Sequence, residues 1–178
     1  MSDPIKLSVA APAYNEAEGI EAVVTEWHTF LSTCDDVAEF EIVICNDGSK
    51  DRTGEILDRL TLPFPNLRPL HFAQNQGAAA ALNHAIAATH GDWVLLLDSD
   101  GQFPIENLTD MLAAVRRSNA KAAIGIRQKK DVPFARFGSW PAGWCAIWCM
   151  AAGLPISTPP SSWCGGRSCA AWGWKPRA

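Results

Sequence analysis

The chain has 178 residues and a formal net charge of −4, from 15 Lys and Arg against 19 Asp and Glu. This length suits one domain with a full core, and the lack of a basic excess argues against nucleic acid as a partner. The start of the chain has no signal-peptide pattern, and no stretch reaches the ~18 apolar residues of a membrane span. We therefore expect a cytoplasmic protein whose six cysteines stay mostly reduced.

Strand and helix patterns alternate along the first two thirds of the chain. Apolar runs predict strands at 6–11, 39–45, 67–72, 93–97 and 121–126. The segments between them carry apolar residues at helical spacing, as in Ile20, Val23, Val24, Trp27, Phe30 and Leu31. The third helix is alanine-rich and is expected to reach about His90. This alternation predicts an α/β fold, with a mostly parallel sheet and helices on both faces.

Polar residues follow three of the predicted strands. Tyr14-Asn15-Glu16 comes after the first strand, Asp47-Gly48-Ser49 after the second, and Asp98-Ser99-Asp100 after the fourth. Parallel strands place all three groups on one edge of the sheet, where ligands of open α/β sheets bind. Each group alone is ordinary turn chemistry, but three together indicate a site.

The pair Asp98 and Asp100 has two interpretations. It is either a solvated turn or a site for a hard cation such as Mg²⁺ or Mn²⁺, held by oxygen ligands and shared with substrate phosphates. A nucleoside diphosphate would use the other groups on the same edge. Asp47 would accept a hydrogen bond from a ring N–H of uracil or guanine, Tyr14 would pack on the base, and Asn75 and Gly77 would offer free N–H groups at a helix start to a phosphate.

Residues 5–139 resemble the nucleotide-sugar-binding domain of family 2 glycosyltransferases, which are inverting enzymes of the Rossmann-like GT-A fold. The resemblance rests on four segments of this sequence: 12–16, 43–53, 75–82 and 97–104. The Asp-x-Asp-x-Gln form and the region of Arg127 look most like the branch that glycosylates polyprenyl phosphates. One departure is Ala78, where relatives often have a polar or basic residue.

The resemblance implies roles for individual residues. The UDP- or GDP-linked sugar would be bound by Pro12, Tyr14, Glu16, Asp47, Asn75, Gly77, Asp98 and Ser99. The metal ligands would be Asp98, Asp100 and Gln102, of which the two aspartates count as catalytic. The acceptor phosphate would be held by Arg127, Arg136 and Ser139, although a solvated basic loop explains these three nearly as well.

The implied reaction is direct displacement at the anomeric carbon with inversion. A polyprenyl phosphate acceptor is already ionised and needs no strong general base, whereas a sugar hydroxyl of another lipid or glycan acceptor would need one. The chain has no carboxylate after Asp131. This favours the phosphate acceptor, with peripheral contact to the cytoplasmic face of a membrane.

Residues 140–178 differ from the rest, because they hold six of the eight tryptophans and no Asp or Glu. We interpret residues 1–139 as an incomplete GT-A domain and 140–178 as a non-native or disordered tail produced by a frameshift or premature stop. A genuine interfacial segment is the alternative. Two other functions are considered: a truncated, inactive nucleotide-binding remnant, and a phosphatase of the haloacid-dehalogenase type. In that class the Asp-x-Asp motif follows the first strand, which disfavours it here.

Overall fold

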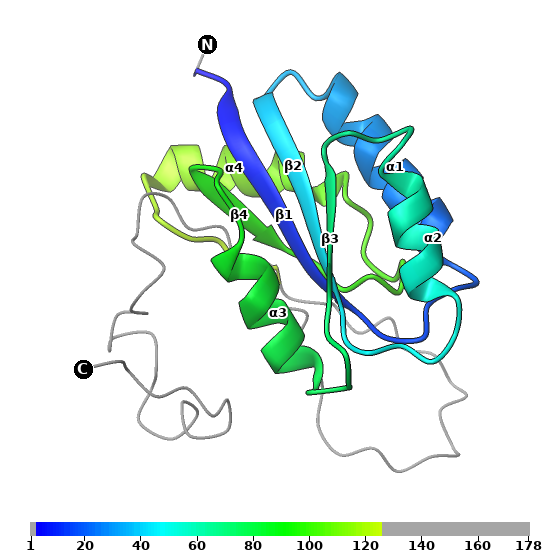
Figure 1. Ribbon diagram of the computed structural model, residues 1–178. Helices are drawn as coiled ribbons and strands as arrows, with labels where there is room; N and C mark the ends of the chain where they lie inside the picture. The colour runs from blue at the N-terminus through cyan, green and yellow to red at the C-terminus, as the bar shows by residue number, and fades with distance from the viewer. Residues whose placement is uncertain (1–2, 126–178) are drawn as a thin grey trace, which may run out of the picture.

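Strands and helices alternate throughout the computed structural model, which describes residues 3–125 (Figure 1). The elements in chain order are β1 (Ile5–Ala13), α1 (Ile20–Thr33), β2 (Val37–Asn46), α2 (Thr53–Leu60), β3 (Leu67–His71), α3 (Ala78–Ala87), β4 (Trp93–Leu96) and α4 (Asn107–Ser118). The predicted α/β class is confirmed. No helix in this part of the chain has the length and apolar character needed to cross a membrane.

The four strands form one parallel sheet in the order β3-β2-β1-β4. The chain therefore moves outward from β1 to β3 and then returns to the other side of β1 with β4. Such a reversal of strand order opens a crevice at the carboxyl ends of the strands. The ends of three strands are in register there, because Ala13 pairs with Asn46 and Asn46 pairs with His71.

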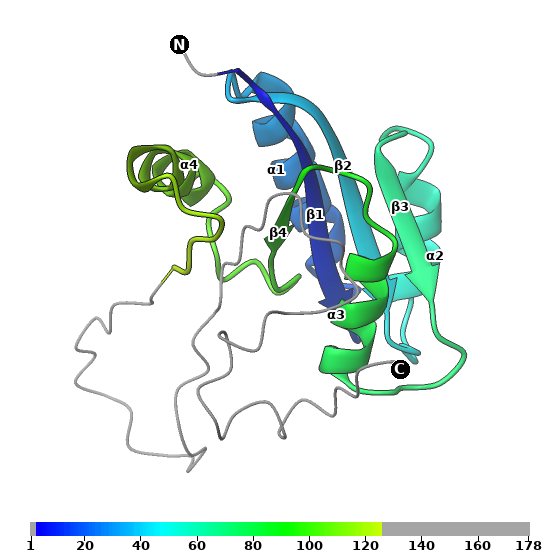
Figure 2. The same cartoon turned by 90° about the vertical axis from the view of Figure 1, so that its left-hand side faces the viewer.

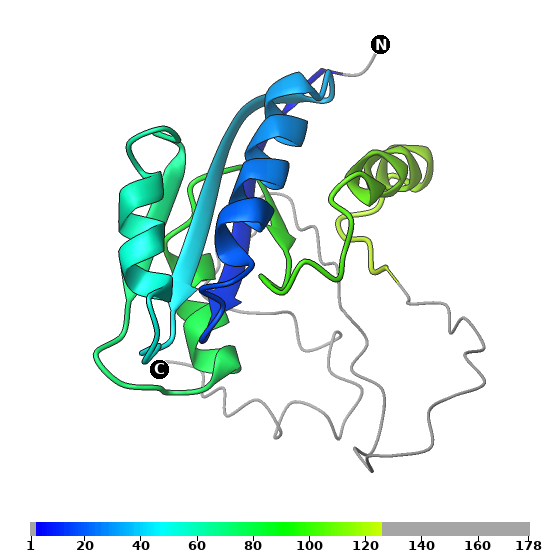
Figure 3. The same ribbon diagram turned by 90° about the vertical axis from the view of Figure 1, so that its right-hand side faces the viewer.

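Helices cover both faces of the sheet (Figures 2 and 3). The larger core joins α1, α2 and α4 to one face, and its centre is the buried indole of Trp27. The smaller core joins α3 to the other face through small side chains such as Ala81 and Ala85, which face Ala10 and Val43. Alternate residues of a strand point to opposite faces, so β1 supplies both cores.

One predicted strand and the end of one predicted helix are wrong. Residues 121–125 form no strand in the structure, and residue 126 lies outside the described part of the chain. Helix α3 ends at Ala87 rather than near His90. It ends there because Arg68 donates a hydrogen bond to the carbonyl of Ala88 and the N–H of His90 donates to Glu41, so the last residues contact the sheet instead of continuing the helix.

Candidate functional site

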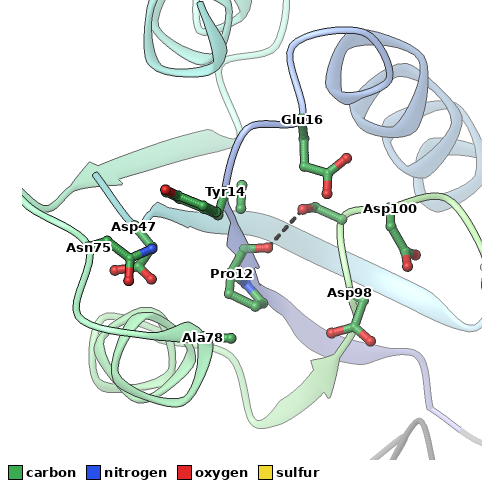
Figure 4. Close-up of a pocket in the computed structure, with 10 residues that line it drawn as sticks. Pro12, Tyr14, Glu16, Asp47, Asn75, Ala78, Asp98 and Asp100 are labelled. Atoms are coloured by element: carbon green, nitrogen blue, oxygen red, sulfur yellow. Dashed lines mark hydrogen bonds between the residues drawn. The ribbon is translucent and has the colours of Figure 1, made fainter. Parts of the chain in front are cut away.

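A cavity of about 290 Å³ lies at the carboxyl ends of β1, β2 and β4 (Figure 4). Its lining comes from loops that are far apart in the sequence. After β1 it includes Tyr14 and Glu16, and from β1 itself Pro12 and Ala13; after β4 it includes Asp98, Ser99 and Asp100. The third side is formed by Asp47, Asn75 and Ala78. Tyr14, Asp47 and Asn75 gather at one end, and Asp98 and Asp100 lie at the other.

The segment after β4 is fixed against the end of β1. The N–H of Leu97 donates to the carbonyl of Ala10, and the buried hydroxyl of Ser99 donates to the carbonyl of Pro12 at 2.8 Å. The inward Ser99 leaves its neighbours Asp98 and Asp100 exposed at the cavity. The Asp-Ser-Asp turn is therefore a rigid platform for two carboxylates.

Asp47 is buried and connects β2 to the start of α3. One carboxylate oxygen accepts the N–H of Gln76 at 2.7 Å, and the other accepts the N–H of Gly77 at 2.9 Å. Asp47 therefore anchors the two residues that lead into α3, whose N-cap residue Gly77 makes no side-chain cap of its own. The expectation that the N–H of Gly77 is free for a phosphate is therefore wrong in this structure.

Close contact between two loops reinforces this arrangement. Gly48 has a φ of +64°, and a Cβ there would lie 2.5 Å from the backbone nitrogen of Asn75. Only glycine fits this approach, and only glycine adopts the left-handed conformation at low cost. The turn that presents Asp47 is thus shaped by the chain that precedes α3.

The cavity is strongly acidic. Glu16, Asp47, Asp98 and Asp100 line it, and within residues 3–125 its lining includes no Lys, Arg or His. Burial, and then the charge of Asp100, raises the pKa of Asp98. Burial, followed by the charges of Asp100 and Asp51, raises the pKa of Glu16. Both pKa shifts have the same physical cause, because partial burial and neighbouring carboxylates favour the neutral form.

The expected metal ligands are only partly assembled. Asp98 and Asp100 share the cavity, but Gln102 is not among the residues that line it; its backbone N–H donates to Asp100 at 2.9 Å. Within residues 3–125, no group of three or more His, Cys, Asp or Glu side chains is placed to hold a metal ion. Two carboxylates alone would leave a cation to take its other ligands from substrate or water.

Of the other predicted residues, Gly77 does not line the cavity, and its N–H donates to Asp47. Arg127, Arg136, Ser139 and the segment 140–178 lie outside the described residues. Sequence reasoning missed Ala13 and Ala78 as lining residues. Ala78 was noted only as a departure from the family pattern, and alanine carries no chemical signal of a site.

The strand order and the acidic cavity at the strand ends define the chain as an α/β protein with a ligand crevice at its topological switch point. Residues 8–142 match the model of the family described as Glycosyl transferase family 2. This match covers most of the chain, and the chain belongs to that family.

Curated relatives include glycosyltransferase AglD of Haloferax volcanii, 33% identical over 71% of this chain and 20% of the relative. Dolichyl-phosphate beta-glucosyltransferase ALG5A of Trichomonas vaginalis is 30% identical over 71% of this chain and 42% of its own. Bactoprenol glucosyl transferase of Shigella phage SfX is 38% identical over 57% of this chain and 33% of its own. The chain thus spans less than half the length of these relatives.

Solved structures show the same fold. TarS of S. aureus in complex with UDP-GlcNAc is 25% identical, with a TM-score of 0.56 over 75% of this chain and 38% of that one. The mannosyltransferase PcManGT of Pyrobaculum calidifontis, solved with GDP-Man and Mn²⁺, is 23% identical, with a TM-score of 0.61 over 73% of this chain and 38% of that one. The fold is therefore GT-A, as the sequence predicted.

Proposed function

We propose that residues 1–139 form the donor-binding part of an inverting glycosyltransferase, which moves a sugar from a UDP- or GDP-sugar to a polyprenyl phosphate. The observation that carries the proposal is one cavity whose lining includes Tyr14, Asp47, Asp98 and Asp100, which follow three different strands. Support for the acceptor comes from the relatives named as dolichyl-phosphate and bactoprenol glucosyltransferases. Support for the donor comes from TarS, which was solved with UDP-GlcNAc.

The nucleoside would bind at the end of the cavity that holds Tyr14, Asp47 and Asn75. Each carboxylate oxygen of Asp47 accepts one backbone N–H, and a carboxylate oxygen has a second lone pair to offer. An acceptor of this kind favours a base that donates a ring N–H, which uracil and guanine do. The half-exposed ring of Tyr14 would then cover the base.

The diphosphate would bind at the Asp98 and Asp100 end. Among the described residues, the lining has four carboxylates and no lysine, arginine or histidine, so it repels an anionic ligand and we expect binding there to use a cation. Mg²⁺ or Mn²⁺ fits an all-oxygen set of two aspartates plus phosphate oxygens, with Gln102 as a further candidate ligand. When bound, this cation would stabilise the charge of the departing nucleoside diphosphate.

The protein itself would contribute positioning. The Ser99 anchor keeps Asp98 and Asp100 at a fixed distance from the end of β1. The acceptor phosphate is ionised at neutral pH, so displacement at the anomeric carbon needs alignment more than a general base. Arg127, Arg136 and Ser139 are proposed to hold that phosphate.

Isothermal titration of the full chain with UDP and GDP, with and without Mn²⁺, tests the donor site. We expect Mn²⁺ to strengthen binding of one nucleotide, and Asp100→Asn to remove at least about tenfold of this enhancement. The matched control is Asp110→Asn, an exposed aspartate on α4 that does not line the cavity. Equal enhancement in the Asp100→Asn variant would contradict the metal site.

Turnover with a polyprenyl phosphate acceptor separates the transferase from a nucleotide-binding remnant. Sugar transfer that depends on Asp100 supports the enzyme. Nucleotide binding without transfer supports the remnant and leaves the donor site standing.

A further inference from the structure

The loop after β1 and the loop after β2 are joined by reciprocal hydrogen bonds. The N–H of Asn15 donates to the hydroxyl of Ser49 at 2.9 Å, and the N–H of Lys50 donates to the side-chain oxygen of Asn15 at 2.9 Å. Asn15 has a φ of +56°, a left-handed conformation that asparagine tolerates better than most residues. Its side chain therefore stabilises both its own turn and the neighbouring loop.

A second group of hydrogen bonds joins the same two loops further along the chain. The hydroxyl of Thr53 accepts the N–H of Glu16 at 2.8 Å and donates to Asp51 at 2.5 Å. The other carboxylate oxygen of Asp51 accepts the N–H of Ala17 at 3.1 Å. Thr53 is fully buried, so no water would replace its hydroxyl if it were removed. These bonds and those of Asn15 together form a loop clamp.

The loop clamp fixes the backbone on both sides of two cavity residues. Tyr14 precedes Asn15, and Glu16 is held by its own N–H; both side chains line the cavity, whereas Asn15, Asp51 and Thr53 do not. Glu16 has an unfavourable charge environment, because burial and two neighbouring carboxylates raise its pKa. The position of this side chain is therefore set by the hydrogen bonds of its own backbone and of the next residue.

We propose that Thr53 and Asp51 are positioning residues of the donor site, which act through the backbone of Glu16 and Ala17. This inference rests on the proposed donor binding. It assigns a role to the Asp-x-Thr part of the 43–53 segment, which contacts no proposed ligand. A clamped loop is already in its binding conformation, so the ligand does not have to order it.

Thr53→Val tests this role, because valine keeps the shape of the side chain and removes only the hydroxyl. We expect the Kd for UDP or GDP, measured with Mn²⁺, to rise about tenfold, because the clamp holds the backbone of both Tyr14 and Glu16. Thr53→Ser keeps the hydroxyl and is expected to restore affinity. The control is Thr25→Val at an exposed position of α1, where the hydroxyl donates to the carbonyl of Glu21 in the same helix.

Hydrogen exchange of the same proteins measures the clamp directly. The amide of Glu16 is expected to lose protection in Thr53→Val and to keep it in Thr53→Ser. If Thr53→Val does not fold, Asp51→Asn replaces it, because Asp51 is exposed and its amide would lose one acceptor for the N–H of Ala17 or Thr53.

The outcomes separate this inference from the proposed function. A wild-type chain that binds neither UDP nor GDP overturns both. A wild-type chain that binds one of them, together with a folded Thr53→Val or Asp51→Asn variant of equal affinity, overturns the positioning role alone. A loss of affinity that serine does not restore at position 53 also overturns it.

Discussion

Replacing Asp47 by asparagine separates its structural role from base recognition. In the ligand-free protein both carboxylate oxygens of Asp47 accept backbone N–H groups, from Gln76 and Gly77. Asparagine has one acceptor oxygen, so one of these N–H groups would face an NH₂ group instead. Asp47 is 1% exposed, so the new NH₂ group would meet that N–H at a buried position.

The cost follows from these two bonds. A hydrogen bond to a charged group contributes about 1.5–3 kcal/mol, and a buried N–H left without a partner costs about 1–3 kcal/mol. The remaining bond, to a neutral oxygen, would be weaker than the present one. We therefore expect Asp47→Asn to lower the free energy of unfolding by about 2–3 kcal/mol, a large part of a domain's total of roughly 5–15 kcal/mol.

Urea unfolding of the full chain in the absence of nucleotide measures this loss. Asp35→Asn is the control, because it makes the same chemical change at an exposed aspartate. An Asp47→Asn variant within about 0.5 kcal/mol of wild type would refute this anchoring role, since surface changes stay within that range. The base-reading role alone predicts no loss of stability without ligand.

Three further predictions concern other parts of the described chain. Burial, and then the charge of Asp47, raises the pKa of Cys45 from 9.0 to about 11, so iodoacetamide should alkylate it about a hundredfold more slowly at pH 8 in the native than in the urea-unfolded chain. Gly91→Ala should cost more than about 2 kcal/mol in urea unfolding, because the new Cβ would lie 2.7 Å from the backbone nitrogen of Ser8. Burial acts to raise the pKa of Glu41, but hydrogen bonds from Ser8 and His90 and the charge of Arg68 lower it overall. Ionised Glu41 therefore stabilises the fold above its unfolded-state pKa, and a Glu41→Gln variant should lose about 1–2 kcal/mol at neutral pH but progressively less as the pH falls through the folded-state pKa.

The local pattern predicted most of the fold, because buried parallel strands are apolar runs and the helices that cover them have apolar stripes. It failed where distant residues decide the structure. Ala88, Thr89 and His90 suit a helix, but contacts with Arg68 and Glu41 on two strands end α3 before them. Residues 121–125 have strand composition, yet pairing requires a partner strand, which composition does not reveal.

In the site, too, the sequence predicted what local pattern decides and not what distant contacts decide. The three strand ends were predictable as one group, because parallel strands place their carboxyl ends together. The bonds of Asp47 to the start of α3 were not, since nothing in Gln76 or Gly77 indicates which carboxylate their N–H groups meet. A motif shows that a carboxylate is needed, but not whether protein or ligand uses it.

The carboxylates at this edge fall into two groups that the structure distinguishes. Asp47 and Asp51 each accept backbone N–H groups with both oxygens, so the protein itself solvates their charges. The carboxylates of Glu16 and Asp98 accept no hydrogen bond from the described residues, and their pKa values are raised. The first group holds loops and a helix in place. The second group has pKa values raised by partial burial and neighbouring carboxylates, a pattern that is common at ligand sites. Asp51 thus belongs to the scaffold, Asp47 both holds the start of α3 and lines the cavity, and the carboxylates of Glu16 and Asp98 are left open to a ligand.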